Sequence, residues 1–235
     1  DVEAAHKLKT TLVEQEKQSL REVKKETGID TQIWAARSIA QVFDKLNLPY
    51  KRTEKINAPS FTKNFLATHS HPIVKKMAKA REVNKAHTTF IDSIIRYEHK
   101  GRIHADINQI RGEKGGTVTG RFSMSNPNLQ QIPAKGFIGK NMRALFLPEK
   151  DHLWGSFDYS QQEPRIVVHY ALKLKMKGTE EVVESYQEDP NADFHQIVAD
   201  MAKIPRITAK TINLGLFYGM GKNKLQAELG ISKDK

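Results

Sequence analysis

Arg206-Ile-Thr-Ala-Lys210-Thr-Ile-Asn-Leu214-Gly-Leu-Phe-Tyr218-Gly219 is the stretch of this 235-residue chain from which most of the fold can be inferred. Four side chains in it recur every four residues: Arg206, Lys210, Leu214 and Tyr218. On a helix, steps of four place side chains along one slanting stripe. The stripe begins with two cations and ends with an aromatic ring, and at 1.5 Å per residue it spans roughly 18 Å. This length matches a nucleoside triphosphate, with the phosphates at one end and the base at the other.

The same helix carries apolar residues on the side away from the stripe, and this second face predicts burial. These residues are Ala202, Pro205, Ala209, Ile212 and Leu216. Gly219 and Gly221 predict the end of the helix. Basic residues four apart are also typical of an ordinary solvated helix face, and Tyr218 also suits a core position. Both interpretations of the stripe remain open on these residues alone.

The composition favours a polyanionic partner. Thirty-eight Lys and Arg against 27 Asp and Glu give a formal net charge of +11, and so basic a chain most often binds nucleic acid. The sequence contains no cysteine, which excludes disulfides and Cys-ligated metal centres and fits a reducing, cytoplasmic compartment rather than secretion. The chain begins Asp1-Val-Glu, neither a start methionine nor a signal peptide, so we expect it to be part of a longer polypeptide.

Hydrophobic periodicity predicts helices over most of the first 100 residues, broken at Gly28 and resuming over 33–46 and 71–97. Strict alternation predicts a strand over 103–110, and the apolar run 153–159 predicts a second. Helical patterns follow at 160–175 and 191–201, and Pro205 precedes the last helix. The basic helical region has two open interpretations, a DNA-gripping arm or a solvated bundle. The pattern as a whole predicts an α+β, mostly helical fold.

Two further segments carry side chains suited to chemistry. Asp158 follows the apolar run, and a carboxylate where a strand meets a helix is a common metal ligand, although it is more often a helix-entry residue. Ser160 and Glu163 have the spacing of a capping box, which is a purely structural alternative for Glu163. Long donor side chains crowd into positions 121–131, where they either contact minor-groove acceptors or satisfy their own loop. They are Arg121, Asn126, Asn128, Gln130 and Gln131.

Together these segments resemble DNA polymerase family A, the bacterial polymerase I type, and phage members most closely. Asp158-Tyr-Ser-Gln-Gln-Glu163-Pro-Arg165 resembles motif A, and the opening stretch resembles motif B on the fingers helix. Thr117-Val-Thr-Gly-Arg121 and Asn128-Leu-Gln130-Gln-Ile-Pro133 resemble the segment that holds primer–template. The resemblance implies a partial right-hand fold: a thumb-like region over 1–100, part of an antiparallel palm over 101–175 and part of the fingers over 176–235.

The resemblance also implies roles for residues. Asp158, with the Tyr159 carbonyl, would bind two catalytic Mg²⁺ ions that activate the primer 3′-hydroxyl and stabilise leaving pyrophosphate. His195, Arg206 and Lys210 would hold the triphosphate of a deoxynucleotide, and Lys210 would donate a proton to pyrophosphate.

Further roles concern the base, the sugar and the duplex. Tyr218 would close the pocket around the nascent base pair, and Glu163 would exclude a ribose 2′-hydroxyl. Leu214 stands beside the sugar, where the family usually has Phe or Tyr, so we expect altered sugar discrimination. Primer–template DNA would be contacted by Arg121, Asn128, Gln130 and Gln131.

The second catalytic carboxylate of the family lies in a His-Asp-Glu motif after motif B, and the 235 residues contain no such tripeptide. We therefore expect a fragment or one subunit of a DNA-directed DNA polymerase of a bacterial or phage-infected cell, inactive alone and complemented by a chain that carries the rest of palm and fingers. Two alternatives are a non-catalytic nucleic-acid-binding module and a basic helical scaffold protein.

Overall fold

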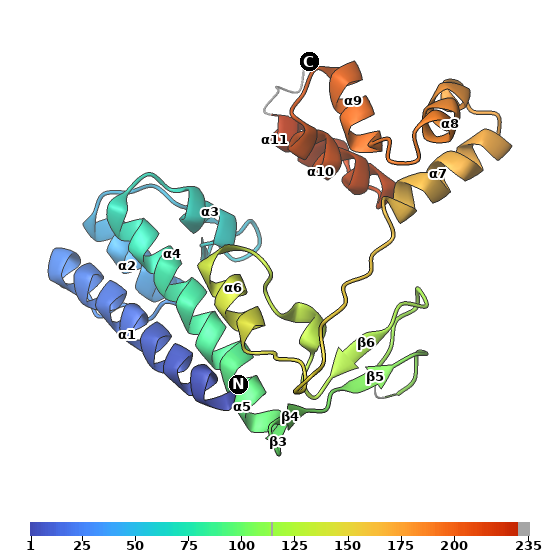
Figure 1. Cartoon of the computed structure of the whole chain (residues 1–235). Coiled ribbons are helices and arrows are strands. Elements are labelled where there is room, and N and C mark those ends of the chain that lie inside the picture. Colours follow the sequence, from blue (N-terminus) through green and yellow to red (C-terminus); the bar gives the residue numbers. More distant parts are fainter. Residues whose placement is uncertain (114, 230–235) are drawn as a thin grey trace. The chain divides into compact units, whose positions relative to one another are not determined.

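The computed structural model of the chain describes residues 1–113 and 115–229 and divides into two compact units, Asp1–Leu153 and Trp154–Lys235. Helices dominate both units and the described strands are short and antiparallel, which confirms the predicted α+β, mostly helical class (Figure 1). The first unit contains α1 (Val2–Thr27), α2 (Ala36–Lys45), β1 (Lys51–Arg52), β2 (Pro59–Ser60), α3 (Lys63–Thr68), α4 (Pro72–Lys85), a π-helical turn (Ala86–Ile91), α5 (Asp92–Tyr97), β3 (Glu98–His99), β4 (Arg102–Ile103), β5 (Asp106–Asn108), β6 (Ser123–Ser125), a 3-10 turn (Leu129–Gln131) and α6 (Gly136–Ala144). The second contains α7 (Gln162–Lys173), α8 (Thr179–Glu188), α9 (Phe194–Ala202), α10 (Arg206–Phe217) and α11 (Lys222–Leu229).

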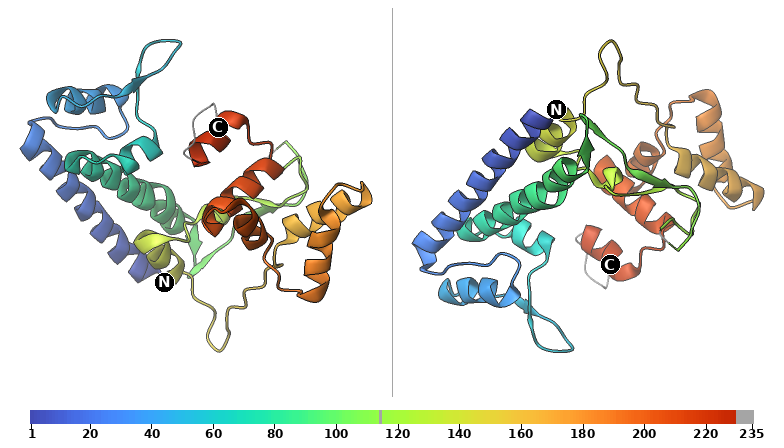
Figure 2. Two further views of the ribbon diagram at one scale, coloured as in Figure 1. Left: turned by 90° about the horizontal axis from the view of Figure 1, so that it is seen from above. Right: turned by 90° about the horizontal axis from the view of Figure 1, so that it is seen from below.

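The first unit is built on α1 and α4, which run side by side in all three views (Figures 1 and 2). The side chain of Asp1 caps α1 by accepting the Ala4 N–H at 2.9 Å. Gly28 ends the helix at φ 75°, a left-handed conformation that costs glycine little, so the predicted break is confirmed. No helix in the described ranges has both the length and the apolar character needed to cross a bilayer.

Two hydrophobic clusters stabilise this unit, one at each end of the α1–α4 pair. In one, Phe43 is fully buried against the rings of Tyr50, Phe61 and Phe65. Burial of one such ring contributes roughly 1.5–3 kcal/mol. The other cluster joins Leu12 and residues of the π-helical turn to α6.

The predicted helix over 71–97 contains a π-helical turn between α4 and α5. Ala86, His87 and Ile91 are all buried along this turn, which winds more widely than an α-helix. The His87 ring nitrogen Nε2 lies 2.6 Å from a carboxylate oxygen of Glu16, and Asn84 donates to the same carboxylate at 3.0 Å. A polar network thus locks the turn onto α1.

Both strand predictions needed correction. The predicted strand 103–110 is broken into β4 and β5, and β5 pairs with β6 through Ile107 opposite Met124. The prediction of a strand over 153–159 was wrong: residues 152–159 are irregular, and Leu153 and Phe157 are almost fully exposed. A strand needs a neighbour for its backbone groups, and no described segment pairs with this run.

In the second unit, α7, α9 and α10 occupy the predicted helical regions, whereas α8 and α11 had no sequence prediction and neither did α6 of the first unit. The predicted capping box at Ser160 was wrong. Helix α7 begins after Gln161, which adopts a left-handed conformation (φ 53°), and no side chain caps it. This backbone turn leaves the Glu163 carboxylate available for a different partner.

Candidate functional site

Helix α10 carries the stripe that the sequence predicted. Arg206, Lys210 and Tyr218 are exposed and Leu214 is half-buried. Helix α10 ends at Phe217 and Gly219 follows at φ 77°, which confirms the predicted stop. Within the described residues Lys210 makes no hydrogen bond or ion pair, so its charge at the centre of the stripe faces solvent.

The buried face of α10 differs in part from the prediction. Ala209 and Ile212 are buried as expected, but Ala202, Pro205 and Leu216 are exposed, and Asn213 is buried instead. Asn213 is accommodated because its side-chain amide donates to Nδ1 of His195 at 3.2 Å. A buried polar group with a partner avoids the cost of desolvation without a hydrogen bond. The buried face of α10 therefore includes a polar contact with α9, where the sequence pattern predicted only apolar side chains.

His195 lies on α9 and is 5% exposed. Burial lowers its pKa below the ordinary value, and the nearby cations Lys210 and Arg206 act in the same direction against the opposing charge of Asp193. The ring is therefore neutral at pH 7 and accepts through Nδ1, so the proton resides on Nε2. His195 can act as a neutral hydrogen-bond donor but adds no positive charge.

Arg206, at the other end of the stripe, is held by Asp193. Its Nε donates to Oδ2 of Asp193 at 2.6 Å, and Nη2 contacts the same oxygen. Oδ1 of Asp193 accepts the backbone N–H groups of His195 at 2.9 Å and Gln196 at 3.3 Å, which caps α9. Partial burial raises the pKa of Asp193, but the bonds from Arg206 and the two N–H groups outweigh it, so the pKa lies below its ordinary value.

Tyr218 connects the stripe to the segment that resembles motif A. Its hydroxyl donates to Oε1 of Glu163 on α7. Asp158 precedes Glu163 by five residues, so this contact joins the end of α10 to the helix that follows the candidate metal carboxylate. Glu163 and Tyr218 are thus brought together within one unit.

Gln161 and Arg165 also hold this region together, and sequence reasoning assigned neither of them a role. Gln161 donates to the Ala192 carbonyl at 2.8 Å and accepts the Phe194 N–H at 2.8 Å. Arg165 stacks over the Tyr186 ring with 4.4 Å to its centroid. No local pattern could have found these contacts, because each joins residues 21 or more positions apart; Asp193, by contrast, has a visible N-cap signature before an apolar helix.

The candidate metal ligands lie in the irregular segment before α7. Asp158 and Tyr159 are both exposed. Within the described residues no group of three or more His, Asp or Glu side chains is arranged to hold a metal ion. One carboxylate and one carbonyl are too few protein ligands for two Mg²⁺ ions, even though Mg²⁺ keeps several waters. The described residues by themselves do not fit a two-ion site.

The predicted duplex-binding segment belongs to the first unit and leads into the 3-10 turn. Asn126 accepts the Tyr97 hydroxyl at 3.0 Å and donates to Asp106 at 2.9 Å, so the segment is fixed to α5 and β5. Gly116 precedes it at φ 97°, and a Cβ there would lie 2.2 Å from the Ile110 carbonyl oxygen, so only glycine fits.

The four predicted DNA ligands are all exposed. Asn128 accepts the Gln130 N–H at 3.1 Å, and the Gln130 side chain donates to the Phe122 carbonyl at 3.1 Å. Part of their capacity therefore serves the loop itself. Thr117 donates to the Arg121 carbonyl at 2.7 Å, and Gln131 lies at the end of the 3-10 turn.

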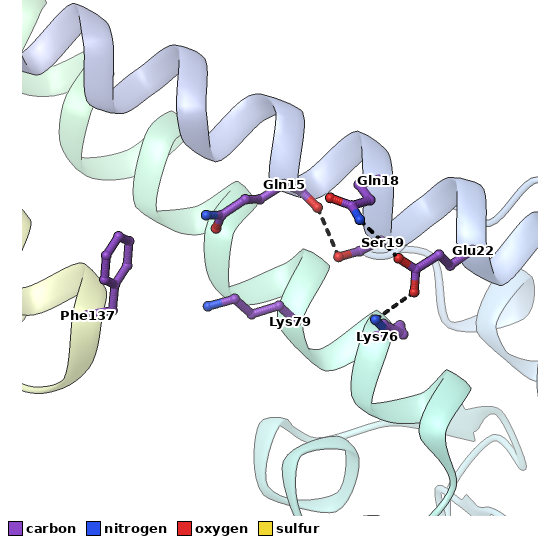
Figure 3. Close-up of a pocket in the computed structure, with 7 residues that line it drawn as sticks. All are labelled: Gln15, Gln18, Ser19, Glu22, Lys76, Lys79 and Phe137. Carbon is purple, nitrogen blue, oxygen red and sulfur yellow. Dashed lines mark hydrogen bonds and ion pairs between the residues drawn. The ribbon is translucent and has the colours of Figure 1, made fainter.

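A cavity of about 340 Å³ lies elsewhere, between α1 and α4 with Phe137 of α6 opposite (Figure 3). Lys76 donates to Glu22 at 2.6 Å and Gln18 donates to the same carboxylate at 3.3 Å. Hydrogen bonding and the charge of Lys76 lower the pKa of Glu22. None of the predicted site residues lines this cavity, and its ionised groups are already paired.

Comparison with known proteins gives a consistent result. A sequence model of DNA polymerase family A matches residues 2–235. The chain is 38% identical over 236 residues to a DNA-directed DNA polymerase of Pseudomonas phage M6, and 36% identical over 204 residues to the thermostable DNA polymerase I of Thermus aquaticus. These matches cover 93% and 81% of the chain but only 35% and 23% of the two relatives, so the chain spans about a third of the length of the phage protein.

A solved structure shows the same fold. The POL domain of Pol1 from M. smegmatis, in complex with DNA primer–template and dNTP, superposes with a TM-score of 0.79 at 24% identity and covers 100% of this chain and 41% of its own. The chain belongs to DNA polymerase family A.

Proposed function

We propose that this chain forms the nucleotide-gripping and primer–template-holding part of a DNA-directed DNA polymerase. Residues 1–100 serve as the thumb, 101–175 as part of the palm and 176–235 as part of the fingers. The observation that carries the proposal is the anchoring of the α10 stripe at both ends, by Asp193 at Arg206 and by Glu163 at Tyr218. This anchoring leaves Lys210 exposed between them.

In this proposal the stripe binds an incoming deoxynucleoside triphosphate. Arg206 and Lys210 offset the charge that builds up on the phosphate oxygens as the primer hydroxyl attacks. Lys210 is placed to donate a proton to leaving pyrophosphate. His195 adds a neutral Nε2–H donor. Tyr218 closes the pocket at the base, and Leu214 lies next to the sugar together with Glu163, which excludes a 2′-hydroxyl.

The exposed donors of the first unit hold the duplex. Arg121, Asn128, Gln130 and Gln131 would contact minor-groove acceptors, which occupy similar positions in every base pair and so allow binding without sequence preference. The net charge of +11 supplies the attraction to phosphates.

Asp158 and the Tyr159 carbonyl serve as metal ligands only together with a second carboxylate, since the described residues do not fit two Mg²⁺ ions alone. When bound, such ions would lower the pKa of the attacking hydroxyl and stabilise the leaving oxygen. We therefore expect the 235-residue chain to be inactive by itself and to regain activity with a chain that supplies the carboxylate.

Two assays test the proposal. For a fluorescent primer–template, the logarithm of the association constant should fall linearly with the logarithm of the salt concentration. Primer extension should appear when a fragment containing the rest of palm and fingers is added. Salt-sensitive DNA binding without nucleotide binding would instead favour a non-catalytic DNA-binding module, which the single carboxylate of the metal segment also suits. Absence of DNA binding and of nucleotide binding would refute both.

A further inference from the structure

One carboxylate, that of Asp193, holds two candidate triphosphate ligands at once. Its Oδ1 accepts the backbone N–H of His195 at 2.9 Å, and its Oδ2 accepts Nε of Arg206 at 2.6 Å. His195 lies in the first turn of α9 and Arg206 begins α10, so the same side chain contacts the start of both helices. We propose that Asp193 is the positioning residue of the triphosphate site, a role that rests on the proposed function of the α10 stripe.

The geometry leaves the arginine able to bind phosphate. Arg206 uses Nε and Nη2 on a single oxygen of Asp193, so within the described residues its Nη1 group has no partner, and the side chain is 47% exposed. A guanidinium presents five N–H donors in a rigid fork, and one edge suffices for a carboxylate. Asp193 thus removes rotamer freedom that phosphate binding would otherwise have to overcome.

The other half of the site is fixed by a second buried group. Asn213 donates to Nδ1 of His195, which directs the ring proton to Nε2. Asp193 fixes the backbone of His195 at the start of α9, and Asn213 fixes the tautomer and ring orientation of His195. Arg206 and the neutral donor His195 are therefore oriented before any phosphate arrives.

For Asp193→Asn, the loss of charge and the loss of positioning predict opposite changes in affinity for phosphate. This change removes a negative charge close to the site, which by electrostatics alone strengthens binding of a polyanion. Asparagine is as good an N-cap as aspartate, so α9 keeps its start. Weaker binding by the variant that disappears in the Arg206→Ala background therefore comes from an arginine that is no longer held in place.

The experiment is calorimetric titration of the full chain with inorganic tripolyphosphate, for the wild type, Asp193→Asn, Arg206→Ala and the double variant. We expect Asp193→Asn to weaken binding about three- to tenfold, in line with a hydrogen-bonded charge pair, and to have no further effect once Arg206 is alanine. Asp200→Asn is the matched control, because it removes one charge from the same helix, and Asp200 contacts Gln196 rather than Arg206. It should bind as tightly as the wild type or slightly more tightly.

Each remaining outcome counts against the inference in a distinct way. Equal or tighter binding by Asp193→Asn shows that the carboxylate is indifferent or competes with phosphate. A loss that persists in the Arg206→Ala background shows that Asp193 acts on the fold alone. A wild-type chain that binds no tripolyphosphate refutes the proposed function of the stripe and the inference with it.

Discussion

Asn213→Ala should destabilise the α9–α10 pair selectively. Asn213 is 6% exposed and donates at 3.2 Å to His195, which is 5% exposed. Removing the donor leaves a buried ring nitrogen without its hydrogen bond, at a cost of about 1–3 kcal/mol. The better helix propensity of alanine returns about 0.5 kcal/mol. The net loss of about 0.5–2.5 kcal/mol corresponds to an opening equilibrium roughly 2–70 times larger.

Hydrogen exchange measured by mass spectrometry can localise this effect. At pH 8, where His195 is neutral, peptides from α9 and α10 should exchange roughly 2–70 times faster in Asn213→Ala. Peptides from α1 and α4 should be unchanged, because they belong to the other compact unit. Asn223→Ala on α11 is the matched control: Asn223 is exposed, so only the propensity gain applies. Equal protection in the two variants would show that the Asn213–His195 bond does not stabilise the helix pair.

Three further predictions concern the same unit. Lowering the pH from 8 to 5 should reduce the urea midpoint of the unit. Burial and nearby cations lower the pKa of His195, so the unfolded chain takes up the proton first, below about pH 6.5. His195→Gln should flatten this pH dependence, and an unchanged slope would contradict the prediction. Tyr218→Phe removes the donor to Glu163 and should cost about 0.5–1.5 kcal/mol in the same urea titration, whereas no change would mean that the contact contributes nothing. Lys210→Ala should weaken tripolyphosphate binding and reduce its salt dependence, whereas Lys222→Ala, also exposed, should not; equal effects would indicate a merely diffuse positive charge.

The helices could be predicted because their signals are local. Gly28 and Gly219 end α1 and α10 with the left-handed backbone that their residue type favours. The exposed stripe followed from spacing alone. Periodicity did not reveal the π-helical turn after Lys85, because one extra residue per turn shifts the pattern without erasing it.

The strand at 153–159 could not be judged from its own residues. Leu153, Trp154 and Phe157 have the composition of a buried strand, yet they are 94%, 70% and 97% exposed. Whether such a run pairs depends on a neighbouring strand, and its own composition says nothing of that neighbour. The prediction from spacing that Leu216 is buried was wrong for a related reason, since the side chains of α9 that pack on α10 determine which side of α10 is buried.

The contacts of the site show why the sequence pattern could identify the stripe residues but not their partners. Arg206 and Tyr218 each contact a carboxylate from another helix, Asp193 and Glu163, 13 and 55 residues away. Sequence spacing finds the stripe because its members share one helix, but it cannot find partners at those separations. Only Lys210, midway between them, remains without a partner in the described chain. The two end contacts fix α10 against Asp193 and Glu163, and they leave Lys210 exposed between them, as its proposed contact with phosphate requires.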